Sequence, residues 1–197
     1  NDTIQFVKAM QLCWLQFPIT VSPLQQINMI DQQGYRPNVC IVIANSAGQL
    51  FWGKRRQQSA WQFPQGGIEA GESVESALYR ELQEETGLVS EQVQLIAVTK
   101  QWYRYRLPKH MLKNNQSNYV GQKQKYGLLK ILDDQHQFVL DQDRHPEFDD
   151  WAWVPYWYPV GEVWAPKQEA YRRALKELVP FLRLCLPEVK DRARSTS

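Results

Sequence analysis

The sequence predicts a single α/β (or α+β) domain built around a mixed β-sheet. Strand-like and helix-like patterns alternate along the 197 residues, with no internal repeat and no low-complexity segment. The length allows one full hydrophobic core and is short for two. The composition, with 43% hydrophobic and 22% charged residues, is typical of a globular protein and excludes disorder of the whole chain.

The first 28 residues differ from the rest, and we expect them to be a poorly ordered extension outside the domain. Strand-like patterning begins just after Met29. The apolar run LCWLQFPITV (12–21) is interrupted by Pro18 and is too short to span a bilayer, so no membrane partner is expected. We place the domain at 29–182 and a tail at 183–197.

The cysteines and the net charge exclude few classes of function. Three cysteines at wide spacing, without a C-x-x-C pair, indicate free thiols in a reducing cytoplasm, with no disulfide and no zinc site. The formal net charge is +2, but the stretch 100–130 has eight Lys or Arg residues and no acid. Five aromatic residues are interleaved with these cations, a pattern that suits nucleic acid and equally an ordinary sheet with a basic face.

The first strands are predicted by short apolar and β-branched runs. NVCIVIAN (38–45) is typical of a buried strand, and a turn at 46–49 leads to a second strand, LFWGKR (50–55). The segment WQFPQGG (61–67) ends a strand and opens a loop, because it contains a proline and two glycines.

A helix is predicted over 73–86 by its terminal residues. Ser73 is a suitable N-cap, and Glu75 lies in the first turn, where negative charge is favourable. Gly87 ends the helix as a C′ glycine.

Three strands and one helix complete the prediction. The strands are expected at 93–107, 122–132 and 149–156. The final helix is expected at 167–186, where leucines and Ala170 form a helical stripe, and Pro180 should kink or split it.

The helix at 73–86 has an unusual excess of negative charge on its apolar side. At about 100° per residue, Glu81, Glu84 and Glu85 continue the stripe formed by Val74, Ala77 and Leu78. Carboxylates turned toward an interior are costly unless a cation meets them. Arg80 can pair with Glu84 one turn on, but one arginine cannot neutralise three carboxylates.

A divalent cation would supply the missing charge. Clustered carboxylate oxygens suit Mg²⁺ or Mn²⁺ better than a metal that favours nitrogen or sulfur. Gly66 and Gly67 come just before the helix and allow their backbone to approach a metal or a phosphate closely. The alternative interpretation is a Glu-rich solvated helix face, which an arbitrary REL-EE segment would favour.

The spacing over 66–88 resembles the Nudix box. It reads glycine, five residues, Glu72, seven residues, Arg80-Glu81-Leu82, one residue, Glu84-Glu85, one residue, Gly87-Leu88, and every fixed position is filled. The resemblance implies an α/β/α sandwich in which this strand-loop-helix unit holds one or more divalent cations. It also implies cleavage of a diphosphate linked to another moiety.

The resemblance assigns roles to individual residues. Metal ligands would be Glu81, Glu84 and Glu85, with Gly66 contributing from the loop and Glu147 from a loop outside the box. Arg80 would orient the glutamates, and Glu81 is favoured over Glu84 or Glu147 as general base. Structural support would come from Gly67, Glu72 and Gly87.

Segments outside the box resemble the bacterial RNA pyrophosphohydrolase branch, also described as dinucleoside polyphosphate hydrolases. They are GYRPNV (34–39), WQFPQGG (61–67), GQKQK (121–125), PEFDDWAWV (146–154) and YWYPV (156–160). The branch removes pyrophosphate from the 5′-triphosphate or diphosphate end of RNA and leaves a monophosphate, which promotes decay of the transcript.

The same resemblance implies a set of contacts to phosphates or to the first bases: Arg36, Arg55, Lys167, Gln122, Lys123 and Lys125. Trp164, Ala165 and Pro166 occupy a place where the branch has apolar or aromatic residues against a base. Proline is a poorer stacking surface than phenylalanine there.

Two other functions stay open from the sequence. The same chemistry could act on dinucleoside polyphosphates or free nucleotides, and the fold could serve as a non-catalytic nucleotide- or RNA-sensing module. Tryptophans 151, 153 and 157 are expected in the core, and His110, His136 and His145 receive no catalytic role.

Overall fold

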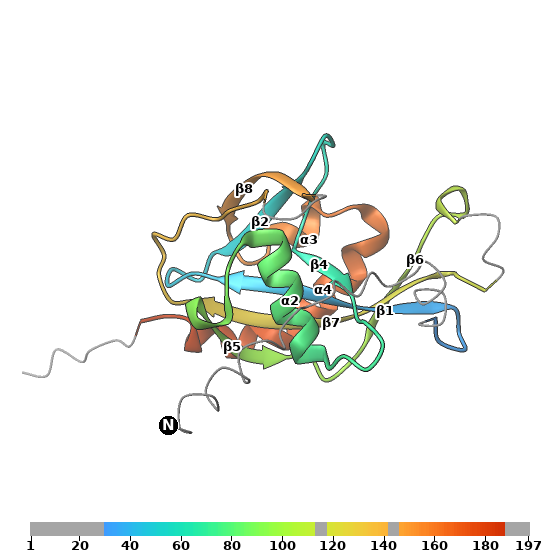
Figure 1. The fold of residues 1–197 in the computed structure, drawn as a ribbon, viewed down its shortest axis with the longest axis horizontal. Helices are drawn as coiled ribbons and strands as arrows, with labels where there is room; N and C mark the ends of the chain where they lie inside the picture. The colour runs from blue at the N-terminus through green and yellow to red at the C-terminus, as the bar shows by residue number, and fades with distance from the viewer. Residues whose placement is uncertain (1–29, 113–117, 142–145, 188–197) are drawn as a thin grey trace, which may run out of the picture.

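The computed structural model describes residues 30–112, 118–141 and 146–187. These residues form an eight-stranded mixed sheet with helices on both faces (Figure 1). The predicted α/β/α sandwich is therefore confirmed. The extension predicted at 1–28, Cys13, His145 and the tail beyond 187 lie outside the described residues.

The elements follow one another in an alternating order. The strands are β1 Tyr35–Ala44, β2 Leu50–Arg55, β3 Trp61–Gln62, β4 Gln65–Gly67, β5 Val93–Val98, β6 Tyr103–Arg106, β7 Gly121–Ile131 and β8 Phe148–Val154. The α-helices are α2 Val74–Thr86, α3 Tyr158–Glu162 and α4 Gln168–Leu178. Short 3-10 turns are η1 Ser90–Gln92, η2 Lys109–Met111, η3 Ala165–Lys167 and η4 Val179–Leu184.

Strand β1 is the centre of the sheet. The strand order is β3-β2-β1-β7-β5, with β4 paired to β1, β6 to β7 and β8 to β2. The β1–β7 pair is parallel and the other pairs are antiparallel. A strand buried on both faces is expected to be apolar at every position, and 39–44 of β1 is fully buried.

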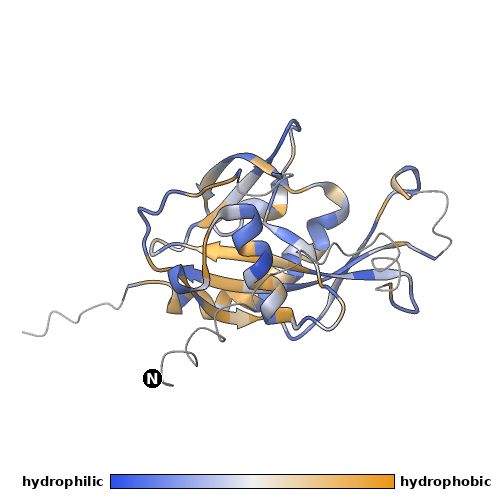
Figure 2. Cartoon of the chain, viewed as in Figure 1, coloured by the Kyte–Doolittle hydropathy of each residue, from blue (hydrophilic) through white to orange (hydrophobic). Residues whose placement is uncertain are grey.

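The two faces of β1 serve two separate cores. Val39, Ile41 and Ile43 pack with α2, whereas Cys40, Val42 and Ala44 pack with α4. The apolar strands lie between the helices in Figure 2. Cys185 is buried in the α4 core, so the chain stays packed beyond position 182, and Cys40 and Cys185 are both free thiols.

The prediction of one long strand over 93–107 is wrong. The chain leaves the sheet at 99–102, between β5 and β6. Thr99 causes the break, because its hydroxyl accepts from the Tyr126 amide (3.0 Å) and donates to the Gln101 carbonyl (3.1 Å). Each half then pairs with a different part of β7.

The final helix is shorter than predicted. α4 ends at Leu178 and the chain continues as the 3-10 turn η4, since Pro180 has no N–H and cannot continue an α-helix. The short helix α3 was not predicted. Within the part of the chain that the structure describes, no helix has the length and apolar character needed to cross a bilayer.

One of the three tryptophans predicted in the core is not there. Trp151 and Trp153 pack around Phe51, with ring centroids 5.7 and 6.4 Å away. Trp157 is 50% exposed, so its prediction is wrong. It precedes α3 at the surface and stacks edge-on against Tyr156.

Candidate active site

Helix α2 is fixed at both ends by its own sequence. Oγ of Ser73 accepts a hydrogen bond from the Ser76 amide (3.0 Å). Gly87 adopts the left-handed conformation (φ 73°) and donates its N–H to the Gln83 carbonyl. The predicted ends of the helix are thus confirmed, and its glutamates are held in defined positions.

Arg80 connects the glutamates with the preceding loop. Its Nε and Nη2 bind the two carboxylate oxygens of Glu72, both at 2.9 Å, and Nη2 also donates to the Gly67 carbonyl (2.8 Å). Its Nη1 donates to Glu81 Oε1 (2.7 Å) and Glu84 Oε2 (3.1 Å). A planar guanidinium suits this bidentate geometry, so Arg80 is placed to orient the box carboxylates.

Glu72 is the acid that ties the loop to the helix. Burial acts to raise its pKa, but hydrogen bonds from Arg80 and from the Glu69 amide (2.9 Å) hold the pKa below its usual value. The carboxylate therefore stays ionised and anchors the loop against α2.

The three box glutamates differ in exposure. Glu81 and Glu85 are only 8% and 6% exposed, as the predicted inward orientation requires. Glu84 is the exception, because 46% of its side chain is exposed at the edge of the stripe that α2 buries. Glu85 Oε2 accepts a hydrogen bond from the backbone N–H of Gln65 (2.9 Å), and this bond joins the helix to β4.

The chain fold brings Glu147 to these carboxylates. Burial raises the pKa of Glu81 to about 7, and it raises the pKa of Glu85 well above the usual value. The negative charge of Glu147, which lies just before β8, adds to both shifts. One electrostatic site is therefore shared by Glu81, Glu84 and Glu85 of α2 and by Glu147 from a distant segment.

Gly66 and Gly67 leave room for two functional side chains. A Cβ on Gly66 would lie 1.8 Å from the Glu81 carboxyl group, and a Cβ on Gly67 would lie 2.2 Å from Nη2 of Arg36. A side chain at either position would therefore displace the Glu81 carboxyl group or the Arg36 guanidinium. The structure places Gly66 directly against a predicted metal ligand.

A cavity of about 520 Å³ lies beside Glu147. Polar and aromatic side chains line it, among them Arg55, Trp61, Gln62, Tyr105, Trp164 and Lys167. It combines cations, amides and flat rings, the chemical groups that bind phosphates and bases.

Lys167 is the buried cation of this cavity. It is 6% exposed, and its Nζ donates to Oε1 of Gln62 and of Gln65, both at 2.9 Å. Burial lowers its pKa to about 8. Nζ also lies 5.5 Å from the centre of the Tyr105 ring. Its hydrogen-bond partners are neutral, so its charge is not cancelled by a salt bridge at close range.

The model of the NUDIX domain matches residues 34–179. The chain belongs to the NUDIX family. The matched segment contains the complete box, Glu147 and the residues of the cavity.

Curated relatives support a narrower assignment within the family. The chain is 53% identical over 155 residues to the RNA pyrophosphohydrolase of Pseudomonas fluorescens strain SBW25, covering 78% of this chain and 98% of the relative. It is 55% identical over 153 residues to the RNA pyrophosphohydrolase of Marinomonas sp. strain MWYL1, covering 77% and 95%.

Two solved structures share the fold at low identity. The dihydroneopterin triphosphate pyrophosphohydrolase of E. coli aligns with a TM-score of 0.60 at 20% identity, over 74% of this chain and 97% of that one. The Ap4A hydrolase binary complex of C. elegans aligns with a TM-score of 0.52 at 19% identity, over 74% and 99%. At this identity the likeness supports the NUDIX fold alone.

The carboxylates of the NUDIX box fit a hard divalent cation. Arg80 pairs with Glu72, Glu81 and Glu84, whereas the buried Glu85 has no ion pair with it. Oxygen donors of this kind suit such an ion. NUDIX hydrolases in general require a divalent metal. Across 30–112, 118–141 and 146–187, no three His, Cys, Asp or Glu side chains are already gathered around one point. Arg80 holds one oxygen each of Glu81 and Glu84 in this arrangement.

The predicted substrate contacts divide into two groups. Arg55, Gln122 and Lys167 line the cavity, and Gln122 accepts a short hydrogen bond from the Tyr105 hydroxyl. Lys123 and Lys125 contact Trp102 on the other face of β7, because successive residues of a strand point to opposite sides. Lys123 and Lys125 therefore lie outside the cavity that Gln122 lines, and their contact with substrate stays a prediction.

Sequence reasoning missed the residues that position Lys167. Gln62 and Gln65 flank Phe63 and Pro64 in the segment WQFPQGG and hold the ammonium between them. The two glutamines on either side of Phe63-Pro64 were the sequence pattern that could have indicated this role. Only the fold shows that Lys167, a hundred residues later, lies between them.

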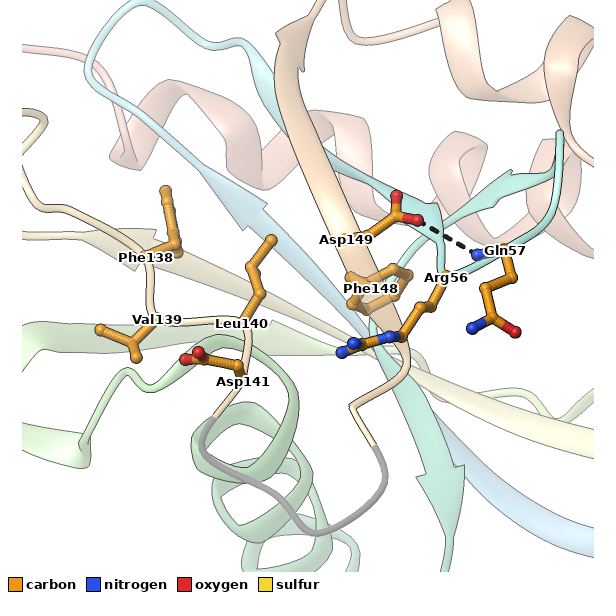
Figure 3. Close-up of a pocket in the computed structure, with 8 residues that line it drawn as sticks. All are labelled: Arg56, Gln57, Phe138, Val139, Leu140, Asp141, Phe148 and Asp149. Carbon is orange, nitrogen blue, oxygen red and sulfur yellow. Dashed lines mark hydrogen bonds between the residues drawn. The ribbon is translucent and has the colours of Figure 1, made fainter.

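A second cavity has a volume of about 620 Å³ (Figure 3). Its walls are the segment 138–141 and the residues Arg56, Gln57, Phe148 and Asp149. Figure 3 shows the bond from the Gln57 amide to Asp149 (3.1 Å), which closes the turn after β2. None of these lining residues is a predicted site residue.

Proposed function

We propose that this chain is a divalent-metal-dependent RNA pyrophosphohydrolase. It removes pyrophosphate from the 5′-triphosphate end of RNA and leaves a 5′-monophosphate, which promotes mRNA decay. The observation that carries the proposal is the position of the box glutamates and Glu147 beside a cavity with a buried lysine. The identity of more than 50% to proteins named RNA pyrophosphohydrolase supports the choice of substrate.

The glutamates form the reaction centre in this proposal. Mg²⁺ or Mn²⁺ would be held by Glu81, Glu84, Glu85 and Glu147, with the carbonyl of Gly66 as a further ligand. When bound, the cation supplies charge neutralisation for the polyphosphate and acidifies the attacking water. Glu81 is assigned as the proton acceptor in preference to Glu84 or Glu147, because it is buried directly against the loop at Gly66.

The cavity binds the RNA end. Lys167 and Arg55 contact phosphate oxygens, and the Nε of Arg55 is buried without a partner among the described residues. Trp61 and Trp164 form aromatic walls on which the first bases stack. Arg36 adds charge beside the loop at Gly67. Since the substrate is a transcript, we place the reaction in the cytoplasm.

A substrate comparison tests the proposal. A short 5′-triphosphate RNA, a diadenosine polyphosphate and free nucleoside triphosphates are supplied at equal concentration with Mg²⁺, and the release of pyrophosphate or phosphate is measured. RNA should give the highest kcat/KM. A wide advantage for the free nucleotides would reject RNA as the substrate, although the hydrolase assignment would survive.

A pair of variants separates the parts of the site. Arg55→Gln should raise KM for RNA, with a smaller effect on the free nucleotides, because it removes a contact of the cavity. Arg172→Gln is the matched control, since it removes the same charge from an exposed position on α4. Equal losses in both variants would contradict a specific role for Arg55.

A further inference from the structure

The strands β1, β6 and β7 continue past α2 as an arm with two different faces (Figures 1 and 2). One face lines the cavity through Tyr105 and Gln122. The opposite face presents a basic and aromatic surface, here named the platform. Its residues are Tyr35, Trp102, Arg104, Arg106, Lys123 and Lys125.

The strand register concentrates positive charge on the platform. Arg104 of β6 lies directly opposite Lys123 of β7. Like charges at directly opposed positions destabilise a sheet, and the ion pair of Lys123 with Asp31 offsets part of this repulsion. Gly121 separates Tyr35 from Arg106, and because it has no side chain, Nε of Arg106 reaches the Tyr35 hydroxyl (3.4 Å).

Each aromatic ring of the platform lies against cations. The guanidinium carbon of Arg104 is 5.4 Å from the centre of the Tyr35 ring. Nζ of Lys123 and of Lys125 are 5.2 and 5.4 Å from the Trp102 ring. The arginines are exposed, whereas Lys123 is also paired with Asp31 (2.8 Å).

Lys125 has a second task on the platform. Its Nζ donates to the carbonyls of Thr99 and Lys100, at 2.8 and 2.7 Å. It therefore holds Trp102 and the segment between β5 and β6 in place. The exposed cations that remain available to a partner are Arg104 and Arg106, beside the Tyr35 ring.

We propose that the platform binds the RNA chain downstream of the 5′ end, an inference that rests on the proposed function. Exposed guanidinium groups beside aromatic rings bind single-stranded nucleic acid through phosphate contacts and stacking. Among the described strands β6 pairs with β7 alone, so its free edge joins the two faces of the arm. Leu107 and Pro108 line the cavity at this edge, and an RNA chain leaving the cavity passes them to reach Arg104 and Arg106.

The platform makes the enzyme sensitive to RNA length. A triphosphorylated dinucleotide fills the cavity without reaching the platform, whereas a longer chain contacts both. The contacts to phosphates release counterions, so the affinity that a longer RNA gains from the platform falls as the salt concentration rises. The wild type therefore has a lower KM for the long RNA at low salt, and the two KM values converge at high salt.

The test uses Arg104→Gln/Arg106→Gln and, as a control with the same change in charge, Arg172→Gln/Lys176→Gln on α4. KM and kcat are measured over a salt series for a triphosphorylated dinucleotide and for a single-stranded RNA of about twenty nucleotides, long enough to cover several binding sites. The platform variant should raise KM only for the long RNA, with kcat unchanged. Its slope of log KM against log salt should fall by about 1.4, or about 0.7 for each cation removed.

Each outcome decides for or against the platform. Equal loss on both substrates, no loss on the long RNA, or the same loss in the α4 control would overturn the proposal. Arg104→Lys/Arg106→Lys, which keeps the charge, should retain most of the salt slope. Failure of the wild type to release pyrophosphate from either RNA would instead reject the proposed function, and so the two failures are distinguishable.

Discussion

Two cations of the site, Arg80 and Lys167, have opposite surroundings. Arg80 is bound by the carboxylates of Glu72, Glu81 and Glu84, so its charge is used within the protein. Lys167 is more deeply buried, yet its hydrogen bonds go to the neutral amides of Gln62 and Gln65.

The difference separates two tasks. A cation matched by acids stabilises and orients a structure, whereas a cation held by neutral amides keeps its charge for an incoming phosphate. We therefore expect changes at Arg80 to affect stability and the geometry of the glutamates. Changes at Lys167 should mainly affect substrate affinity.

The largest effect on activity is expected from a change to one of the box glutamates. Glu85→Gln should lower kcat on the order of 10³-fold, because it removes a charged ligand from the reaction centre while keeping its shape. Burial disfavours the charged form of Glu85, so the melting temperature should stay the same or rise. Steady-state kinetics and calorimetry measure the two quantities. A kcat near the wild-type value would contradict the metal-ligand role.

Arg80→Ala tests the expectation that Arg80 stabilises the fold and orients the glutamates. It leaves Glu72 and Glu81 without their partner, and breaking a buried ion pair costs about 3–5 kcal/mol. The guanidinium is 26% exposed, so solvent screening reduces the expected cost to about 2 kcal/mol. The misplaced glutamates should also lower kcat about 10²-fold.

A control for Arg80→Ala is available on α4. Arg172 pairs with Glu169 at an exposed position, so Arg172→Ala should cost less than about 0.5 kcal/mol. Urea unfolding compares the two variants. A similar loss in both would mean that the Arg80 network adds no more stability than a surface pair.

Lys167→Met tests the expectation that Lys167 acts mainly on substrate affinity. It should raise KM for triphosphorylated RNA about 30-fold, which corresponds to one charge-assisted hydrogen bond of about 2 kcal/mol. The free energy of unfolding should change by less than about 1 kcal/mol, since the lost interactions are offset by removing a buried charge. A stability loss as large as that of Arg80→Ala would remove the distinction between the two cations.

The smallest effect is a pH dependence. Burial lowers the pKa of Lys167 to about 8, so the side chain loses its proton, and with it the phosphate contact, as pH rises through this value. Between pH 8 and pH 9, kcat/KM should fall about fivefold. Lys167→Arg keeps its charge over this range and should abolish the fall. An equal fall in both proteins would assign the titration to another group.

Local patterns were sufficient for the elements with clear end signals. Ser73 and Gly87 fixed the ends of α2, and the β-branched run 38–45 identified the central strand. Prediction failed at Thr99, whose hydroxyl bonds to a strand far along the chain, and at Trp157, which no local pattern places outside the core. The break at Thr99 depends on a contact between distant segments.

The sequence by itself determined the reaction chemistry. The spacing of Arg80, Glu81, Glu84 and Glu85 is set within one helix, where position along the chain fixes position in space. The tertiary structure decided which other residues join them. Pairing of β2 with β3 and β8 brought Gln62 and Glu147 together, and packing of the turn η3 added Lys167. The alternation along β7 placed Gln122 at the cavity and Lys123 on the opposite face. A sheet brings together residues that are remote in sequence, and the spacing of residues along the chain does not predict such contacts.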